Sequence, residues 1–502
     1  MKRYVLSLLL MLVSLFAFSQ NDNGKVRDGY DAIRESMLEK FRASKDEMAK
    51  EYTSFRDRVM KEYVDFVRKA WDIFEGEPIP APEEEPVPPV VMPDEDKVLP
   101  IDDTPVPINI VVEPEPEPFV PQPKPIEPIK VVPEVKDVVR FSFFGTDASV
   151  RFDVAEKVVL AGVDGNSVAD ALERMAAQTH ENMIADCLAL REKHSLSDWA
   201  YINMLLELSK EIYGDDENSA ALLTAYIFMQ SGYKMRLATD NAKLYMLYAS
   251  KHLVYEKPCF MVGDDRYYPV GNVPPRLHIC EASYVKEKPL SLIVATPQLF
   301  KYEPAETQHV ASVDYPDFGF DVVVNKNLLD FYSTLPTSMI GENMYSRWAM
   351  YANTPFDRSV KERFYPQIRK KIEGMSELDA ANRILNFVQT GYTYEYDDKM
   401  WGGDRVFFPD ESLFYKYNDC DDRSVLFSRL VRDLLGLDAA LVFVPGHVLV
   451  AVAFNDDVKG GYVTIDGRKF TLCEPTCTNG APVGWSNVGE NTELNVYLLQ
   501  NQ

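Results

Sequence analysis

Hydrophobic and polar positions follow a helical period in the first part of the chain. From Gly29 to Phe74, apolar side chains recur every three or four residues against a background of Lys, Arg, Asp and Glu. This spacing gathers them on one face and predicts one or two amphipathic helices, in a segment that we place at residues 21–76. We favour packing of that face on another helix or a partner over contact with a membrane. The stripe consists of Tyr52, Phe55, Val59, Tyr63, Phe66, Ala70 and Phe74.

The middle of the chain mixes helical and strand patterns. A hairpin is predicted at 140–153, turning near Gly145. Helical patterns cover 168–213 and 219–230, and apolar runs typical of strands cover 244–255, 291–296 and 320–324. We therefore place a mixed α/β region at residues 137–280 and a β-rich connecting region at 281–340.

The clearest pattern lies in the last stretch, which we place at residues 341–502. Helices are predicted at 359–373 and 378–389, and a third begins near Cys420 and ends at Gly436. Two apolar strands separated by Pro445–Gly446 follow, and then two strands joined by an Asp466–Gly467 turn. A helix followed by antiparallel strands predicts an α+β fold.

Composition separates the N-terminal helix from the rest. More than half of the 33 prolines fall between Glu77 and Val135, among many glutamates. Proline fixes its own backbone angle and lacks an N–H donor. Residues 77–136 are therefore predicted to form an extended, semi-rigid acidic linker that is poorly packed.

The first 20 residues have the layout of a secretory signal peptide: two basic residues, an apolar run and a small-residue end. The alternative is a membrane anchor, but the apolar run is short for a span of about 20 residues. We predict an exported protein, periplasmic or extracellular, with the signal peptide removed at 1–20 and no transmembrane anchor. A net charge of −25 argues against a nucleic-acid partner.

Candidate chemistry lies around Cys420. The start of a helix stabilises a thiolate, although Asp419, Asp421 and Asp422 oppose that effect, so a paired base is needed. His447 begins the strand after a Pro-Gly turn and can take the thiol proton, while Glu474 can orient its ring. The alternative interpretation is structural, because a buried Cys is usually a small hydrophobe and a lone His is usually satisfied by packing.

The sequence motifs around these residues resemble those of the bacterial transglutaminase-like superfamily. The resemblance covers residues from about 357 to 498 and rests on Asn418-Asp419-Cys420-Asp421-Asp422, Gly436, His447 and Glu474-Pro475-Thr476. It implies a papain-like core, with a Cys-bearing helix on an antiparallel sheet, and acyl-enzyme chemistry. Glutamate stands where the family has aspartate, and Asn418 stands where it has glycine.

The predicted function is that of an exported thiol enzyme acting on an amide or peptide bond. Cys420 is its nucleophile, His447 its base and Glu474 the orienting acid, and the backbone N–H of Cys420 helps to bind the oxyanion. Trp401 is assigned as a wall of the site, with the core as its alternative position. The predicted partner is a peptide or protein substrate, free or linked to glycan or cell wall.

Two alternatives stay open on cofactors and function. Cys473 and Cys477 flank Glu474 and suggest a zinc site, but their spacing matches no common zinc pattern, so a disulfide or two thiols is preferred. We predict no cofactor and no metal. The rival function, from another class, is a non-catalytic envelope protein that binds peptides or glycans.

A second, fainter pattern resembles the C-terminal one. After a shift of 204 residues, the stretch from Asp216 aligns with the stretch from Cys420, and Gly232 aligns with Gly436. Asp216 replaces the cysteine and Lys243 replaces the histidine. One interpretation is a degenerate transglutaminase-like domain at about 150–275; the other is the common sequence of a helix, a glycine and an apolar strand.

Overall fold

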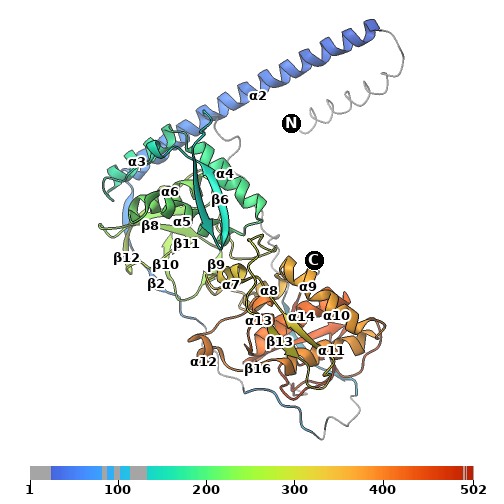
Figure 1. The fold of residues 1–502 in the computed structure, drawn as a ribbon. Helices are drawn as coiled ribbons and strands as arrows, with labels where there is room; N and C mark the ends of the chain where they lie inside the picture. Colours follow the sequence, from blue (N-terminus) through green and yellow to red (C-terminus); the bar gives the residue numbers. More distant parts are fainter. Residues whose placement is uncertain are drawn as a thin grey trace. The chain divides into compact units, whose positions relative to one another are not determined.

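The computed structural model describes residues 24–81, 88–94, 96, 102–112, 133–489, 492 and 494–500. The signal peptide predicted at 1–20 lies outside these residues. The protein is a mixed α+β chain, as the sequence predicts (Figure 1). It divides into two compact units, Met1–Arg58 and Val59–Gln502. Within the described residues, every helix is too short or too polar to cross a lipid bilayer.

The N-terminal helix α2 spans Gly24–Val67, and its first 35 residues make up the described part of the first unit. Contrary to the helical stripe predicted up to Phe74, the helix ends at Val67, where the Trp71 indole donates to the Val67 carbonyl at 2.5 Å. Phe74 lies instead in strand β1, Trp71–Glu75. A spacing of four residues fits both a helix face and one face of a strand, so the stripe could not mark the boundary.

The middle region is a seven-stranded sheet covered by helices. The sheet order is β1-β12-β7-β8-β11-β10-β2. Its strands are β2 (Glu77–Pro78), β7 (Met235–Thr239), β8 (Leu244–Ala249), β10 (Pro258–Val262), β11 (Asp265–Pro269) and β12 (Arg276–Cys280). The accompanying helices are η2 (Val154–Glu156), α3 (Gly165–Ala177), α4 (His180–Lys193), α5 (Asp198–Tyr213) and α6 (Glu217–Gln230). The predicted hairpin is confirmed as β5 (Val138–Phe143) and β6 (Thr146–Arg151).

The connecting region has fewer strands than expected. It holds β13 (Gln308–Ala311), β14 (Gly319–Val322), α7 (Lys326–Tyr332) and β15 (Ser338–Ile340), which pairs with β9 (His252–Val254). The prediction of a strand at 291–296 is wrong. Leu292 and Val294 are buried there, as the alternation implies, but the Val294 carbonyl accepts the Thr354 hydroxyl rather than a strand ladder. Alternating burial does not by itself supply a pairing partner.

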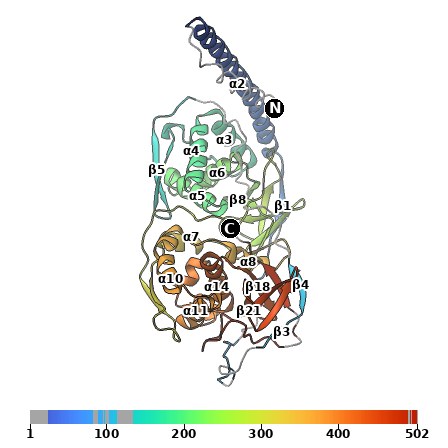
Figure 2. The same cartoon turned by 90° about the vertical axis from the view of Figure 1, so that its right-hand side faces the viewer.

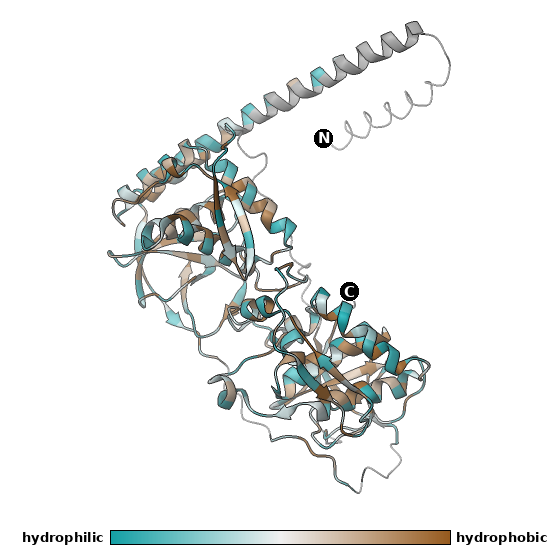
Figure 3. Cartoon of the chain, in the orientation of Figure 1, coloured by the Kyte–Doolittle hydropathy of each residue, from teal (hydrophilic) through white to brown (hydrophobic). Residues whose placement is uncertain are grey.

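The C-terminal region packs helices on a second seven-stranded sheet, of order β3-β20-β21-β19-β18-β22-β4. Hydrophobic residues concentrate in these strands and in the helices beside them (Figure 3). The strands are β3 (Thr104–Pro105), β4 (Ile108–Val112), β18 (Asp438–Val444), β19 (His447–Ala453), β20 (Gly461–Ile465), β21 (Arg468–Cys473) and β22 (Leu494–Leu498). The helices are α8 (Ser346–Asn353), α9 (Arg358–Arg363), α10 (Tyr365–Ile372), α11 (Glu377–Gly391), α12 (Asp397–Trp401), α13 (Pro409–Phe414) and α14 (Cys420–Leu435). A short parallel pair, β16 (Thr393–Tyr394) and β17 (Tyr417–Asn418), precedes α14.

The proline-rich segment is extended, but the expectation that it is poorly packed is wrong for its described residues. β3 and β4 add a parallel strand to each edge of the C-terminal sheet (Figure 2). Between the two sheets' edge strands, Val90 and Met92 are buried against Cys477 and Ala481. The described parts of residues 77–136 therefore act as a strap that belongs to the folded structure.

The two sheets share one topology. In each sheet a helix leads into a hairpin, β7–β8 in the first and β18–β19 in the second. The first strand of that hairpin pairs with the last strand in sequence, β12 or β22. The second strand pairs with one strand of the next hairpin, β10–β11 or β20–β21. The register matches as well: Met235↔Tyr248 of the first sheet becomes Ala439↔Val452 of the second when 204 is added to each number, and both pairs are present. β1 and β2 form the two edges of the first sheet, and β3 and β4 those of the second, so the strap supplies three of these edge strands and β1 lies just before it.

Candidate functional site

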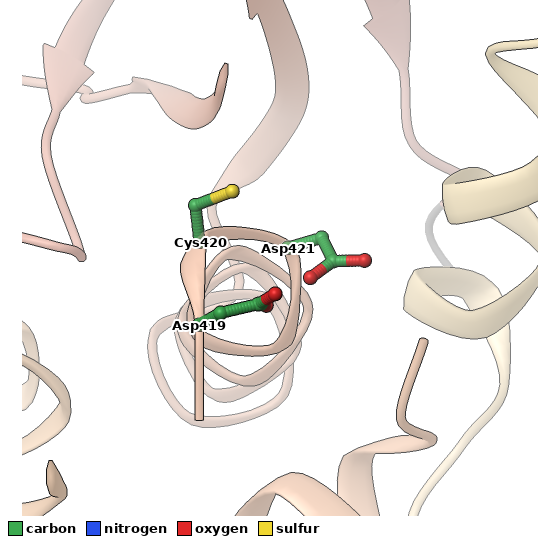
Figure 4. Close-up of side chains that lie close together, drawn as sticks. All are labelled: Asp419, Cys420 and Asp421. Carbon is green, nitrogen blue, oxygen red and sulfur yellow. The ribbon is translucent and has the colours of Figure 1, made fainter. Parts of the chain in front are cut away.

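Cys420 is the first residue of α14. Asp419 is the N-cap, and the helix ends at Gly436 in the left-handed conformation, with φ 69°. Every residue from Asp421 to Arg432 is buried, and Val425, Leu426 and Leu430 are completely so, which places this helix inside the core. Cys420 itself is only partly buried, so a solvent-borne reagent has access to this helix start. Figure 4 shows its side chain at the start of this helix, together with those of Asp419 and Asp421.

His447 and Glu474 form a buried pair. His447 opens β19 directly after the Pro445–Gly446 turn, and its Nε2 lies 3.1 Å from both Oε1 and Oε2 of Glu474. A carboxylate only accepts, so Nε2 carries the proton and donates. Nδ1 is buried and has no hydrogen-bond partner within the described part of the chain. Glu474 thus orients the imidazole ring through Nε2, and Nδ1 remains available as a proton acceptor.

Ser424 ties α14, the helix of Cys420, to β19, the strand of His447. The Ser424 hydroxyl donates to the Val448 carbonyl at 3.0 Å, one residue beyond His447. Ser424 lies one turn after Cys420 and therefore on the same face of α14. The structure brings the Cys420 face of the helix against the start of the strand that carries His447.

Glu474 is held in place from three sides. Its residue is completely buried, and Oε1 accepts the Thr476 hydroxyl at 2.5 Å. The Gln389 amide donates to the Glu474 backbone carbonyl at 2.8 Å and accepts from the Ala481 N–H at 3.1 Å. These bonds fix the loop after β21 against α11, so the carboxylate is positioned before any substrate arrives.

Carboxylates crowd the start of α14. One oxygen each of Asp419 and Asp421 and the Cys420 sulfur all lie within 4.8 Å of one another. Burial, followed by repulsion from Asp421, raises the pKa of Asp419 well above its ordinary value. The same two causes raise the pKa of Asp422. Burial and mutual repulsion thus disfavour ionisation of these carboxyls, and an ionised carboxylate at this point in turn disfavours a thiolate at Cys420.

Sequence reasoning missed several residues beside the nucleophile. Asp421 accepts the Trp348 indole N–H at 3.0 Å. Burial, and then the Cys420 charge, raise the pKa of Tyr394, which places its hydroxyl in the electrostatic neighbourhood of the thiol. Tyr394 lies in the aromatic stretch before the motif, whereas Trp348 lies 73 residues away from Asp421 and carries no local signal.

Trp401 ends α12 and packs among other aromatic side chains. Its ring lies 5.4 Å from the Phe407 ring and 4.9 Å from the Tyr415 ring, and the Arg405 guanidinium stands 5.0 Å from its centroid. It is partly buried, in contact with these three residues. All six cysteines lie within the described residues and none forms a disulfide. Cys473 and Cys477 are both buried beside Glu474.

No family model, curated protein or solved structure matches this chain.

Proposed function

We propose that residues 341–502 form a transglutaminase-like thiol enzyme that acts on an amide or peptide bond. One observation carries the proposal: His447 donates through Nε2 to a fully buried carboxylate and keeps Nδ1 without a partner, at the strand end against the Cys420 helix. A histidine with a purely structural role usually has both nitrogens satisfied when buried. A general base requires an open acceptor nitrogen, and this one lies at the strand end against the helix that begins with the partly exposed Cys420.

The proposed reaction proceeds in two steps. Cys420 Sγ attacks the carbonyl carbon while its proton passes to His447 Nδ1, and the backbone N–H of Cys420 donates to the developing oxyanion. The C–N bond then breaks as the imidazolium returns that proton to the leaving amine, which gives a thioester. Water or a second amine attacks the thioester and loses its proton to Nδ1. The C–S bond then breaks, the imidazolium returns that proton to Sγ, and the acid or the new amide is released. Glu474 stabilises the imidazolium in both steps.

A non-catalytic peptide- or glycan-binding protein on the same fold is the second candidate. The carboxylates of Asp419 and Asp421 within 4.8 Å of the Cys420 sulfur favour it, because they disfavour the thiolate. The Glu474 contacts favour the enzyme, since a binding protein has no need of a buried acid that orients an imidazole.

Alkylation rates separate the two candidates. At pH 6, an ordinary thiol of pKa about 8.5 is less than about 1% thiolate. We expect iodoacetamide to modify Cys420 at least about tenfold faster than a free thiol at this pH, and His447→Ala to remove the excess. Cys420→Ser identifies the labelled site by mass spectrometry. An ordinary rate that His447→Ala leaves unchanged would support the binding protein.

We further propose that the mature protein is exported, with a peptide or protein substrate that is free or linked to glycan or cell wall. The first 20 residues support export, because they have the layout of a secretory signal peptide. Mass spectrometry of the purified native protein tests this: a mature N-terminus near residue 21 is expected, and an intact Met1 or an N-terminus inside the fold would contradict it.

The middle region is, in our interpretation, a second copy of the same core without its chemistry. The shared strand order supports this, together with α6, which matches α14 after the 204-residue shift. Lys243 stands at the histidine's position and pairs with Glu217 at 2.7 Å. Such a copy would serve structure or substrate binding only.

A further inference from the structure

The apolar positions of α2 repeat every 11 residues. Successive positions are four, three and four residues apart, and this spacing continues from Val26 to Phe66. Ser44 is the exception among them. The apolar positions, which we call the repeat face, are Val26, Tyr30, Ile33, Met37, Phe41, Met48, Tyr52, Phe55, Val59, Tyr63 and Phe66. Eleven residues make three turns of about 3.67 residues each, so these positions stay on one face along the whole helix.

The end of the repeat face lies in the second unit and is only partly covered there. Val59 and Tyr63 are buried, but Phe66, the next position, is 53% exposed. The other buried residues at this end of α2 are offset to one side of the repeat face: Met60, Val64 and Val67. The repeat face therefore overlaps only in part with the face by which α2 packs on the middle region.

The described residues of the first unit are those of α2 up to Arg58, so no second described element of that unit covers the repeat face. At other positions of this stretch, the described side chains are exposed and polar or small: Ser36, Glu39, Lys40, Ala43, Glu47, Lys50 and Glu51. A helix gains most of its stability in proteins by packing its apolar face, and Gly29 weakens this one further. The repeat face therefore calls for a partner.

Charge and composition favour a second copy of the chain as that partner. Residues 24–58 hold nine Lys or Arg and eight Asp or Glu, a net charge of +1, whereas the whole chain carries −25. Two copies of a nearly neutral helix can approach without strong repulsion. A helix that lies on a membrane surface is instead rich in Lys and Arg and carries Trp, Phe or Leu on its apolar face. The first Trp of this chain is Trp71, beyond the helix.

We propose that α2 forms a parallel two-stranded coiled coil with α2 of a second copy. An 11-residue repeat gives such a pair a right-handed twist. Parallel pairing in register places Ser44, the one polar position, beside its own equivalent. Antiparallel pairing from Val26 to Phe55 would instead set Ser44 against Met37. Aromatic side chains bury about 150–250 Å² each, so four per helix in this stretch, with four smaller apolar residues, suffice for the roughly 1,200 Å² of a stable interface.

Analytical ultracentrifugation of the purified protein, with all of α2 present, tests the association. At micromolar concentration, the wild type should have twice the mass of one chain. Phe41→Glu puts a charge into the middle of the repeat face and should give a monomer, because an unpaired buried charge is costly. Ala43→Glu is the matched control: it adds the same charge at an exposed position outside the repeat face and should remain a dimer. The second unit should melt alike in all three proteins, since both positions lie outside it.

Disulfide formation tests the orientation. Met37→Cys and Ala43→Cys are each made in a chain that also carries Cys259→Ala and Cys420→Ala, because these two native cysteines are only partly buried. Parallel pairing brings equivalent positions of the repeat face together. Met37→Cys should therefore link two copies rapidly under mild oxidation with copper phenanthroline, and Ala43→Cys should link them far more slowly.

Several results would overturn the proposal. They are a wild type that stays monomeric or forms a trimer or larger assembly, a dimer that Phe41→Glu leaves intact, and Met37→Cys that links no faster than Ala43→Cys. A monomer that binds vesicles of phosphatidylcholine and phosphatidylglycerol through the repeat face would identify a membrane as the partner instead. Cys420→Ala alone should remain a dimer, so this test is independent of the proposed enzyme activity.

Discussion

His447 and Glu474 meet inside the C-terminal region with the imidazole Nε2 at 3.1 Å from both carboxylate oxygens. The two residues are 27 positions apart and come from the start of β19 and the loop after β21. Because β21 pairs with β19, as in Val450↔Cys473, the sheet itself sets the distance between them. The contact therefore depends on the register of two strands rather than on a flexible loop.

Replacement of the nucleophile is the first prediction. Cys420→Ala should reduce amide-directed turnover by several orders of magnitude, as removal of a triad member does. The side chain is only partly buried at a helix start, so the melting temperature should change little. Turnover is assayed on a peptide library alongside Cys259→Ala, which alters a half-buried cysteine outside this region. Activity that survives in Cys420→Ala would remove Cys420 from the mechanism.

Glu474 is tested by two substitutions. Glu474→Gln keeps the size of the side chain but removes the charge that stabilises the imidazolium. The comparable change in a serine protease lowers kcat by roughly 10⁴-fold, and a thiol depends less on its base, so a loss on the order of 10- to 1,000-fold is expected. Glu474→Asp keeps the charge but withdraws the carboxylate from His447 and Thr476, and its turnover should fall between those of wild type and Glu474→Gln.

A purely structural Glu474 gives a different result. In that case Glu474→Gln would lower stability without changing the pH profile of alkylation at Cys420. The matched control is Thr476→Val, which removes the hydroxyl that Glu474 accepts but leaves the charge. It should affect the profile less than Glu474→Gln does.

Asp410 links stability to pH. Burial, and then the Asp357 charge, raise the pKa of Asp410 well above its ordinary value of 3.8. The folded protein therefore holds this proton more tightly than the unfolded chain. Its contribution to stability is present below about pH 3.8 and is lost as the pH rises toward the folded pKa. Asp410→Asn should remove this pH-dependent loss of stability.

The measurement is the melting temperature of wild type and Asp410→Asn across pH 4–8. Within the titration window, the difference should move in favour of the variant by roughly 3–5 °C per pH unit. A difference that stays constant with pH would mean that Asp410 is ionised in the folded protein at little cost.

Local signals made the C-terminal elements predictable. Gly436 has a positive φ that ends α14, and Gly446 has one, of 70°, in the turn before His447. Such residues act over a few positions, so helix ends and hairpins follow from the sequence. The contacts of His447 with Glu474 depend in turn on these hairpins.

Long-range contacts were beyond the same reasoning. Asp397 joins Asp419 and Asp422 through the fold of a loop, and no period in the sequence connects them. The proline-rich segment misled for a different reason. Proline breaks an inner strand, but an edge strand needs hydrogen bonds on one side only, so Pro105 can pair with Tyr462. The proline content therefore predicted that the segment is extended, but it could not predict that the segment packs against the sheet.

Met92 tests whether the strap stabilises the C-terminal region. It is 1% exposed, its N–H donates to the Asn479 side chain at 2.9 Å, and its carbonyl accepts from the same amide at 2.7 Å. Met92→Ala keeps these backbone bonds and creates a cavity beside Cys477, so a loss of about 2–5 kcal/mol in the free energy of unfolding is expected. Chemical denaturation measures that loss, with Val91→Ala as the control, because Val91 is 57% exposed and adjacent in sequence.

The loop that Met92 supports continues into Glu474, so Met92→Ala should also slow alkylation of Cys420, whereas Val91→Ala should not. If the two variants are equally stable, the strap lies on the surface without contributing to the fold, and its removal would leave the C-terminal region intact.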